Sequence, residues 1–73
     1  MPDNLTGGQC AEARKLLGWD MRALRERSMV SLDAISRLER NEGRLQGRTL
    51  RDLRVAFEAA SIEFKNSTVR LLP

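Results

Sequence analysis

The chain has 73 residues, of which 41% are hydrophobic and 32% are charged, and its formal net charge is +3. A chain of this length forms one small domain with a marginal core, and its composition is typical of a folded, soluble protein rather than a disordered one. No apolar run approaches the roughly 20 residues that span a bilayer, and the N-terminus lacks the pattern of a signal peptide. We therefore expect a cytoplasmic protein.

The residue types present argue against an enzyme and against a metal or cofactor site. Cys10 is the single cysteine and the chain has no histidine, so zinc-ligand spacing and the commonest general base are both missing. No glycine-rich phosphate loop is present. Eleven of the 13 basic residues are arginine, which forms bidentate contacts with phosphate and guanine. This composition favours either a nucleic-acid partner or a surface covered by ion pairs.

The first helix is expected over residues 7–17, after a flexible N-terminus at residues 1–5. Thr6 and Gln9 have the spacing of a capping box, and Gly18 is placed to end the helix in the left-handed conformation. Trp19 should anchor the joint to the next helix. The helical period predicts an inner stripe of Cys10, Ala13, Leu16 and Leu17, with Glu12, Arg14 and Lys15 facing water.

Two short helices follow, over about residues 21–27 and 32–40, and together they predict a helix-turn-helix. Asp20 and Ser31 are suitable N-caps, because their side-chain oxygens accept from free N–H groups of a first turn. Val30 precedes the second cap and should fill the angle between the helices. In such a unit the second helix can enter the major groove of DNA.

The outward face of the second helix carries the candidate base-reading residues. Arg37 could pair with a guanine, and Ser36 with a base or a phosphate. Asp33 could accept from a cytosine amine, or could simply favour the helix dipole. Leu32 could touch a thymine methyl or a protein partner. Arg40 also faces outward.

The rest of the chain should close the domain and then change to strands. Arg44 and Arg48 lie in a predicted loop that could follow the DNA backbone, or that could be an ordinary polar loop. Thr49 should cap a helix over residues 50–60, which completes a helix-turn-helix domain of residues 6–60. Alternation of apolar and polar residues then predicts a β-hairpin or strand pair within residues 61–73.

The chain resembles the Xre family of lambda-repressor-like regulators, of the small single-domain bacterial type. The resemblance lies in LTGGQCAEARKLLGW, MRALRER, VSLDAISRLER and RTLRDLRVAFEAASIEF. It implies a mainly α, four-helix domain that binds a double-stranded DNA operator, usually as a homodimer and commonly as a repressor. Carried over by position, it implies phosphate contacts by Met21 and Arg22, and base contacts by Ser31, Leu32, Asp33, Ser36 and Arg37.

Two positions depart from the family pattern. Met21 stands where the family commonly has glutamine, and Met29 stands where its turn usually has a glycine with positive φ. Exposed methionines suit protein binding. An alternative function is therefore that of an antiactivator, which reuses the fold to sequester a transcriptional activator. The contact residues would then be Met21, Met29, Leu32, Ile62, Phe64, Val69 and Leu71.

Overall fold

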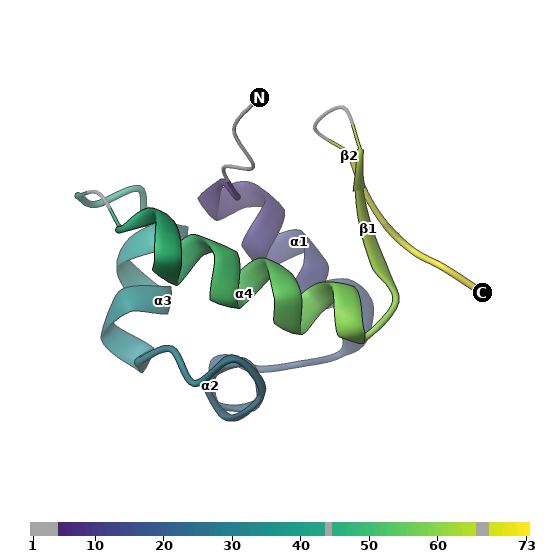
Figure 1. Ribbon diagram of the computed structural model, residues 1–73, viewed down its shortest axis with the longest axis horizontal. Coiled ribbons are helices and arrows are strands. Elements are labelled where there is room, and N and C mark those ends of the chain that lie inside the picture. Colours follow the sequence, from purple (N-terminus) through teal and green to yellow (C-terminus); the bar gives the residue numbers. More distant parts are fainter. Residues whose placement is uncertain (1–4, 44, 66–67) are drawn as a thin grey trace.

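The computed structural model describes residues 5–43, 45–65 and 68–73. It contains four helices followed by a two-stranded antiparallel sheet, which confirms the predicted mainly α fold. In chain order the elements are α1 (Gly7–Leu17), α2 (Met21–Ser28), α3 (Leu32–Glu39), α4 (Gly47–Ala59), β1 (Ile62–Lys65) and β2 (Thr68–Leu71). Figure 1 shows α4 crossing in front of α1, with α3 near one end of α4 and the hairpin at the other.

The ends of α1 are formed by local hydrogen bonds, as the sequence predicts. The Gln9 N–H donates to Thr6 Oγ1 at 3.1 Å, and the Thr6 N–H donates to Gln9 Oε1 at 3.0 Å. At the other end Gly18 has φ 70° and its N–H donates to carbonyl groups of the last turn. Both ends therefore satisfy backbone groups that a helix terminus leaves without a partner.

The start of α4 was predicted wrongly. The helix begins at Gly47, earlier than the predicted start at residue 50, and its N-cap is Gln46 rather than Thr49. A capping residue needs an extended backbone, but Thr49 already lies within the first helical turn. The side chain of Gln46 makes no capping hydrogen bond, so helix α4 starts without the side-chain cap that its sequence suggested.

The core joins all four helices to the hairpin. Phe57, at its centre, stacks on Trp19 with ring centroids 5.9 Å apart and meets Phe64 edge-on at 6.0 Å. The Arg27 guanidinium lies 5.0 Å from the centroid of the Trp19 ring, so Trp19 anchors the joint between α1 and α2 as predicted. The fully buried side chains of greatest volume are Phe57, Leu24, Ile35, Leu53 and Cys10.

Two apolar residues near α1 lie differently from the prediction. Leu5, assigned to a flexible N-terminus, is only 5% exposed and belongs to the core; residues 1–4 lie outside the described part of the chain. Leu16, assigned to the inner stripe of α1, is 42% exposed. Neighbouring elements decide which positions of a helix are covered, and they cover the Cys10 and Ala13 side of α1.

A buried ion pair joins α1 to α3. Arg14 was predicted to face water, but its Nε and Nη2 each donate to the Glu39 carboxylate at 2.7 Å. The Cys10 thiol also donates to Glu39, at 3.1 Å, and Arg14 Nη1 donates to the Trp19 carbonyl at 3.1 Å. The Glu39 side chain is 8% exposed. This network therefore holds the end of α3 against both α1 and the α1–α2 joint.

The network changes the pKa values of its members. Burial raises the pKa of Glu39, but hydrogen bonds from Arg14 and Cys10 outweigh it, and the pKa lies below its ordinary value of 4.5. The hydrogen bond to Glu39 raises the pKa of Arg14. Burial, followed by the contact with Glu39, raises the pKa of the Cys10 thiol well above its usual range. At neutral pH the network holds one carboxylate, one guanidinium and one neutral thiol.

The ion pair makes the stability of the domain depend on pH. Because the pKa of Glu39 is lower in the folded protein, its contribution is present above pH 4.5 and is lost as pH falls through the folded pKa. We expect Glu39→Gln to lower the free energy of unfolding by about 2 kcal/mol at neutral pH. Urea unfolding at a series of pH values should show this difference shrinking in acid. Glu58→Gln, at a 46% exposed side chain, is the control, and a Glu39 effect that did not vary with pH would contradict the assignment.

The turn between α2 and α3 contains backbone strain at Met29. This residue has φ 63° and is 87% exposed, and left-handed geometry is unfavourable for a side chain with a Cβ atom. We expect Met29→Gly to raise the free energy of unfolding by about 1 kcal/mol. Met29→Ala removes the same exposed side chain but keeps the Cβ, so thermal or urea unfolding should show no such gain. Equal effects of the two substitutions would contradict the strain argument.

Candidate nucleic-acid interface

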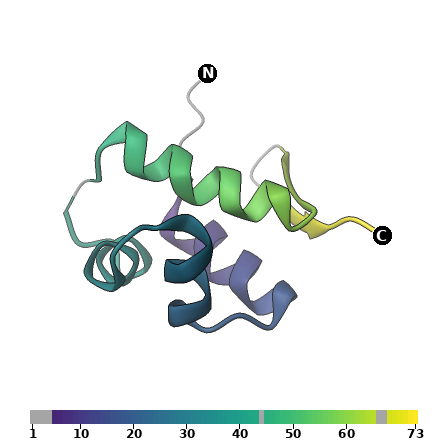
Figure 2. The same cartoon turned by 60° about the horizontal axis from the view of Figure 1, so that its bottom comes forward.

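The helix-turn-helix is formed by α2, the turn at residues 29–31 and α3. The Ala23 N–H donates to Asp20 Oδ1 at 2.8 Å, and the Ala34 N–H donates to Ser31 Oγ at 3.1 Å. Both N-caps were predicted from the sequence, and both are confirmed. Figure 2 shows α2 and α3 on one side of α4, with the hairpin far from α3.

The turn itself is held by Ser28. Its buried hydroxyl donates to the Leu24 carbonyl at 2.7 Å and accepts from the Val30 N–H at 3.2 Å. The Met29 N–H closes α2 by donating to the Arg25 carbonyl at 2.8 Å. Val30 is 6% exposed and fills the angle between the helices as predicted. These bonds fix the direction in which α3 leaves the turn.

The outward face of α3 combines charge with an apolar residue. Ile35 points into the core and is fully buried, whereas Leu32, Asp33 and Arg37 are exposed and Ser36 is half-buried. Arg37 Nη1 lies 3.6 Å from Asp33 Oδ2, one helical turn away, and both side chains are more than half exposed. An ion pair this exposed is weak, so both groups can exchange it for another partner.

The other predicted DNA contacts are spread over α2, the loop and α4. Arg22 is exposed in the first turn of α2, whereas Met21 beside it is half-buried and packs against the core. Arg40 is exposed, and its Nη2 lies 3.4 Å from Glu42 Oε1. Arg48 is exposed in the first turn of α4. The Ser31 hydroxyl is already engaged as a cap, and Arg44 lies outside the described residues.

The structure removes part of the predicted protein-binding surface. Ile62 and Val69 are 2% and 9% exposed, and Phe64 is half-buried against the core. Most apolar side chains of the hairpin therefore pack against the helices of the same domain, because a strand pair this short is not stable without a hydrophobic support. Leu71 remains 45% exposed.

A groove beside the turn was missed by the sequence prediction. Its volume is about 400 Å³ and it is lined by Arg25, Glu26, Met29, Val30 and Ser31. The i, i+4 spacing of Arg25 and Met29 could have placed these two residues on one side of the helix. Arg51, which was not among the predicted DNA contacts, is also exposed in α4 and lies one turn after Arg48 on the same face.

Two other classes of site find no support in the described residues. Residues 5–43, 45–65 and 68–73 contain no group of three or more acidic, cysteine or histidine side chains that could hold a metal ion. In the same ranges no helix combines the length and the hydropathy that crossing a membrane requires.

Comparison with known proteins identifies the family. The family profile described as Helix-turn-helix (HTH_3) matches residues 11–64, which span α2, the turn and α3. No match was found among the curated proteins or the solved structures. The matched residues are well over half of the chain and support a DNA-binding regulatory role. The chain belongs to the helix-turn-helix family.

Proposed function

We propose that this protein is a sequence-specific transcriptional repressor that reads the major groove of DNA with α3. The observation that carries the proposal is the outward face of α3, where Arg37 is exposed on a helix whose opposite face is anchored by buried Ile35. A guanidinium fork fits the O6 and N7 acceptors of guanine. Repression then follows from occupancy of an operator.

The acidic neighbour of Arg37 is compatible with this proposal. Asp33 lies one turn earlier and pairs weakly with Arg37 in the free protein, which directs the guanidinium along the helix face. On DNA, Asp33 can accept from a cytosine amine while Arg37 contacts guanine. Leu32 adds an exposed apolar group that can contact a thymine methyl.

Phosphate contacts would come from helix starts on both sides of α3. Arg22 lies in the first turn of α2 and Arg48 in the first turn of α4. The α4 terminus receives no side-chain cap, so its N–H groups are available to an anion. Such contacts fix the register of the protein on DNA without reading its sequence.

A second candidate function is that of an antiactivator that binds a transcriptional activator. The observation that favours it is the groove of about 400 Å³ beside the turn, next to the 87% exposed side chain of Met29. A flexible methionine at the rim of a groove suits a protein partner. The partner would then contact Met29 and Leu32, which are exposed on the helix-turn-helix.

Titration of labelled DNA separates the two functions. For a repressor we expect specific, salt-sensitive binding to DNA from the upstream region of its own gene. Arg37→Ala should weaken this binding about tenfold or more, as measured by fluorescence anisotropy at low and moderate salt. Met29→Ala and Arg70→Ala, which change the turn and the distant hairpin, should bind as the original chain does.

The opposite result is equally clear. Weak binding that is the same for any sequence and is unchanged by Arg37→Ala would contradict the repressor proposal for that region. An antiactivator contact through apolar groups would respond little to salt, because few counterions are released.

A further inference from the structure

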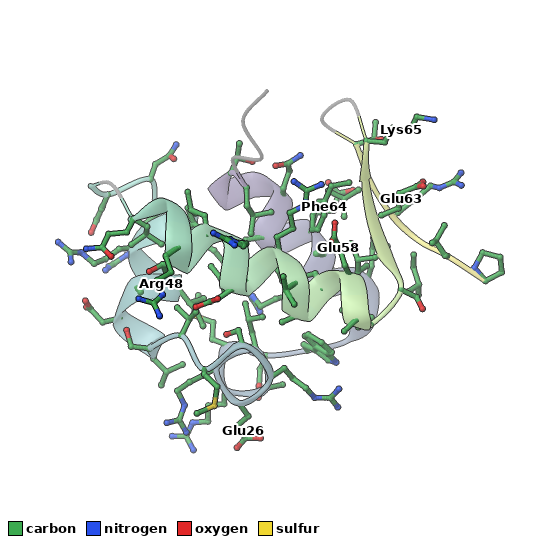
Figure 3. All side chains as sticks on the ribbon, viewed as in Figure 1. Glu26, Arg48, Glu58, Glu63, Phe64 and Lys65 are labelled. Atoms are coloured by element: carbon green, nitrogen blue, oxygen red, sulfur yellow. The ribbon has the colours of Figure 1, made fainter. Side chains whose placement is uncertain are left out.

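The hairpin has one apolar and one polar face. Its register pairs Ile62 with Leu71 and Phe64 with Val69, and these side chains share the face toward the helices. The opposite face carries Glu63 and Lys65, which Figure 3 shows pointing away from the helices, while Phe64 points toward them. Glu63 Oε1 accepts from Arg70 Nε across the strands at 2.8 Å. The polar face therefore combines the acidic side chain of Glu63 with the basic side chains of Lys65 and Arg70.

The outer edge of β1 lacks a strand partner within the described residues. The Leu72 N–H donates to the Ser61 carbonyl at 2.8 Å, so Ser61 bonds toward β2. Bonding direction alternates along an antiparallel ladder. Glu63 and Lys65 therefore also bond toward β2, and the backbone N–H and C=O groups of Ile62 and Phe64 face the open edge.

We propose that this edge of β1 pairs antiparallel with β1 of a second copy of the chain, about a two-fold axis at Phe64. In this register the two Phe64 residues exchange backbone hydrogen bonds, which uses the outward N–H and C=O groups of Phe64. Glu63 of each copy stands opposite Lys65 of the other. These are the closer, non-hydrogen-bonded positions of the ladder, where opposite charges stabilise pairing.

Other registers and the other edge fit less well. Centring the axis on Glu63 or on Lys65 would place like charges opposite each other. At the edge of β2, an axis on Val69 would place Thr68 opposite Arg70, with no pair of opposite charges. A lysine on an edge strand usually opposes pairing. Here Glu63, two residues away on the same face, makes the edge of β1 complementary to itself.

Pairing at this edge leaves the candidate DNA-reading face open. Both ribbon views place α3 and the hairpin far apart, toward opposite ends of α4 (Figures 1 and 2). The dimer would be a continuous four-stranded sheet with helices on the Phe64 face. The proposal goes beyond the repressor function and does not rest on it, because the mass of the particle is measured without DNA.

A charge exchange tests the pairing. Lys65→Glu places two glutamates opposite each other at both ion-pair positions, and Glu63→Lys places two lysines there. We expect each variant to raise the dimer dissociation constant about tenfold, as measured by sedimentation over a concentration series. An equimolar mixture of the two variants should recover dimers, because the lysine introduced at position 63 of one chain then meets the glutamate introduced at position 65 of the other.

The controls separate pairing from folding and from net charge. Arg48→Glu changes the net charge as Lys65→Glu does, but at the end of α4 away from the hairpin (Figure 3), and should leave the dissociation constant unchanged. Circular dichroism should show the helices intact in every variant. The proposal is overturned if the original chain is monomeric throughout, if neither single variant weakens the dimer, or if the mixture recovers none.

Discussion

The position of α3 depends on the ion pair between Arg14 and Glu39. It joins residues 25 apart in sequence, and its fork geometry fixes direction as well as distance. Arg14 also binds the Trp19 carbonyl, so the same guanidinium holds the joint that orients α2. Close contact at the start of α1 completes this arrangement: a Cβ on Gly7 would lie 2.1 Å from the Leu38 carbonyl oxygen. Helix α3 is thus anchored on α1 as well as through its turn.

The turn between α2 and α3 contains backbone strain, whereas the ion pair stabilises the position of α3. Met29 adopts a conformation that glycine adopts without strain, and its side chain projects into solvent. Strained residues persist where the surroundings fix them, and here Ser28 and Val30 do so on either side. The exposed methionine has no role in packing this domain. Its position beside a groove explains why a protein partner stays a candidate alongside DNA.

The candidate interface combines features of both functions. Exposed arginines lie in the first turns of α2 and α4 and on the outward face of α3. Arginine side chains at these places can bind phosphates and guanine. Leu32 and Met29 are apolar and exposed on the same helix-turn-helix. Family membership supports the DNA-binding role. The hairpin is separate from this interface. Its apolar face packs against the core, and its polar face and the open edge of β1 are exposed to solvent.

The sequence by itself determined the helices, most of their ends and the strand pair. The caps at Thr6, Asp20 and Ser31 could be predicted because each side-chain oxygen accepts from the backbone N–H of the residue three positions later. The outward positions of Leu32, Asp33 and Arg37 on α3 were also predicted from the sequence, and all three side chains are exposed. Among the helix ends, the start of α4 was predicted wrongly, because the helix begins at Gly47 and Thr49 lies inside its first turn.

Only the tertiary structure decided which of these surfaces are covered. Arg14 was predicted to face water, but in the folded chain α3 places Glu39 beside it, and the two side chains form an ion pair. Leu5 became part of the core and Leu16 did not, because covering elements come from distant parts of the chain. The hairpin's apolar residues, predicted as a possible partner surface, were mostly used inside the domain for the same reason. Burial and ion pairing depend on non-local neighbours, whereas caps and periodicity depend on residues a few positions away.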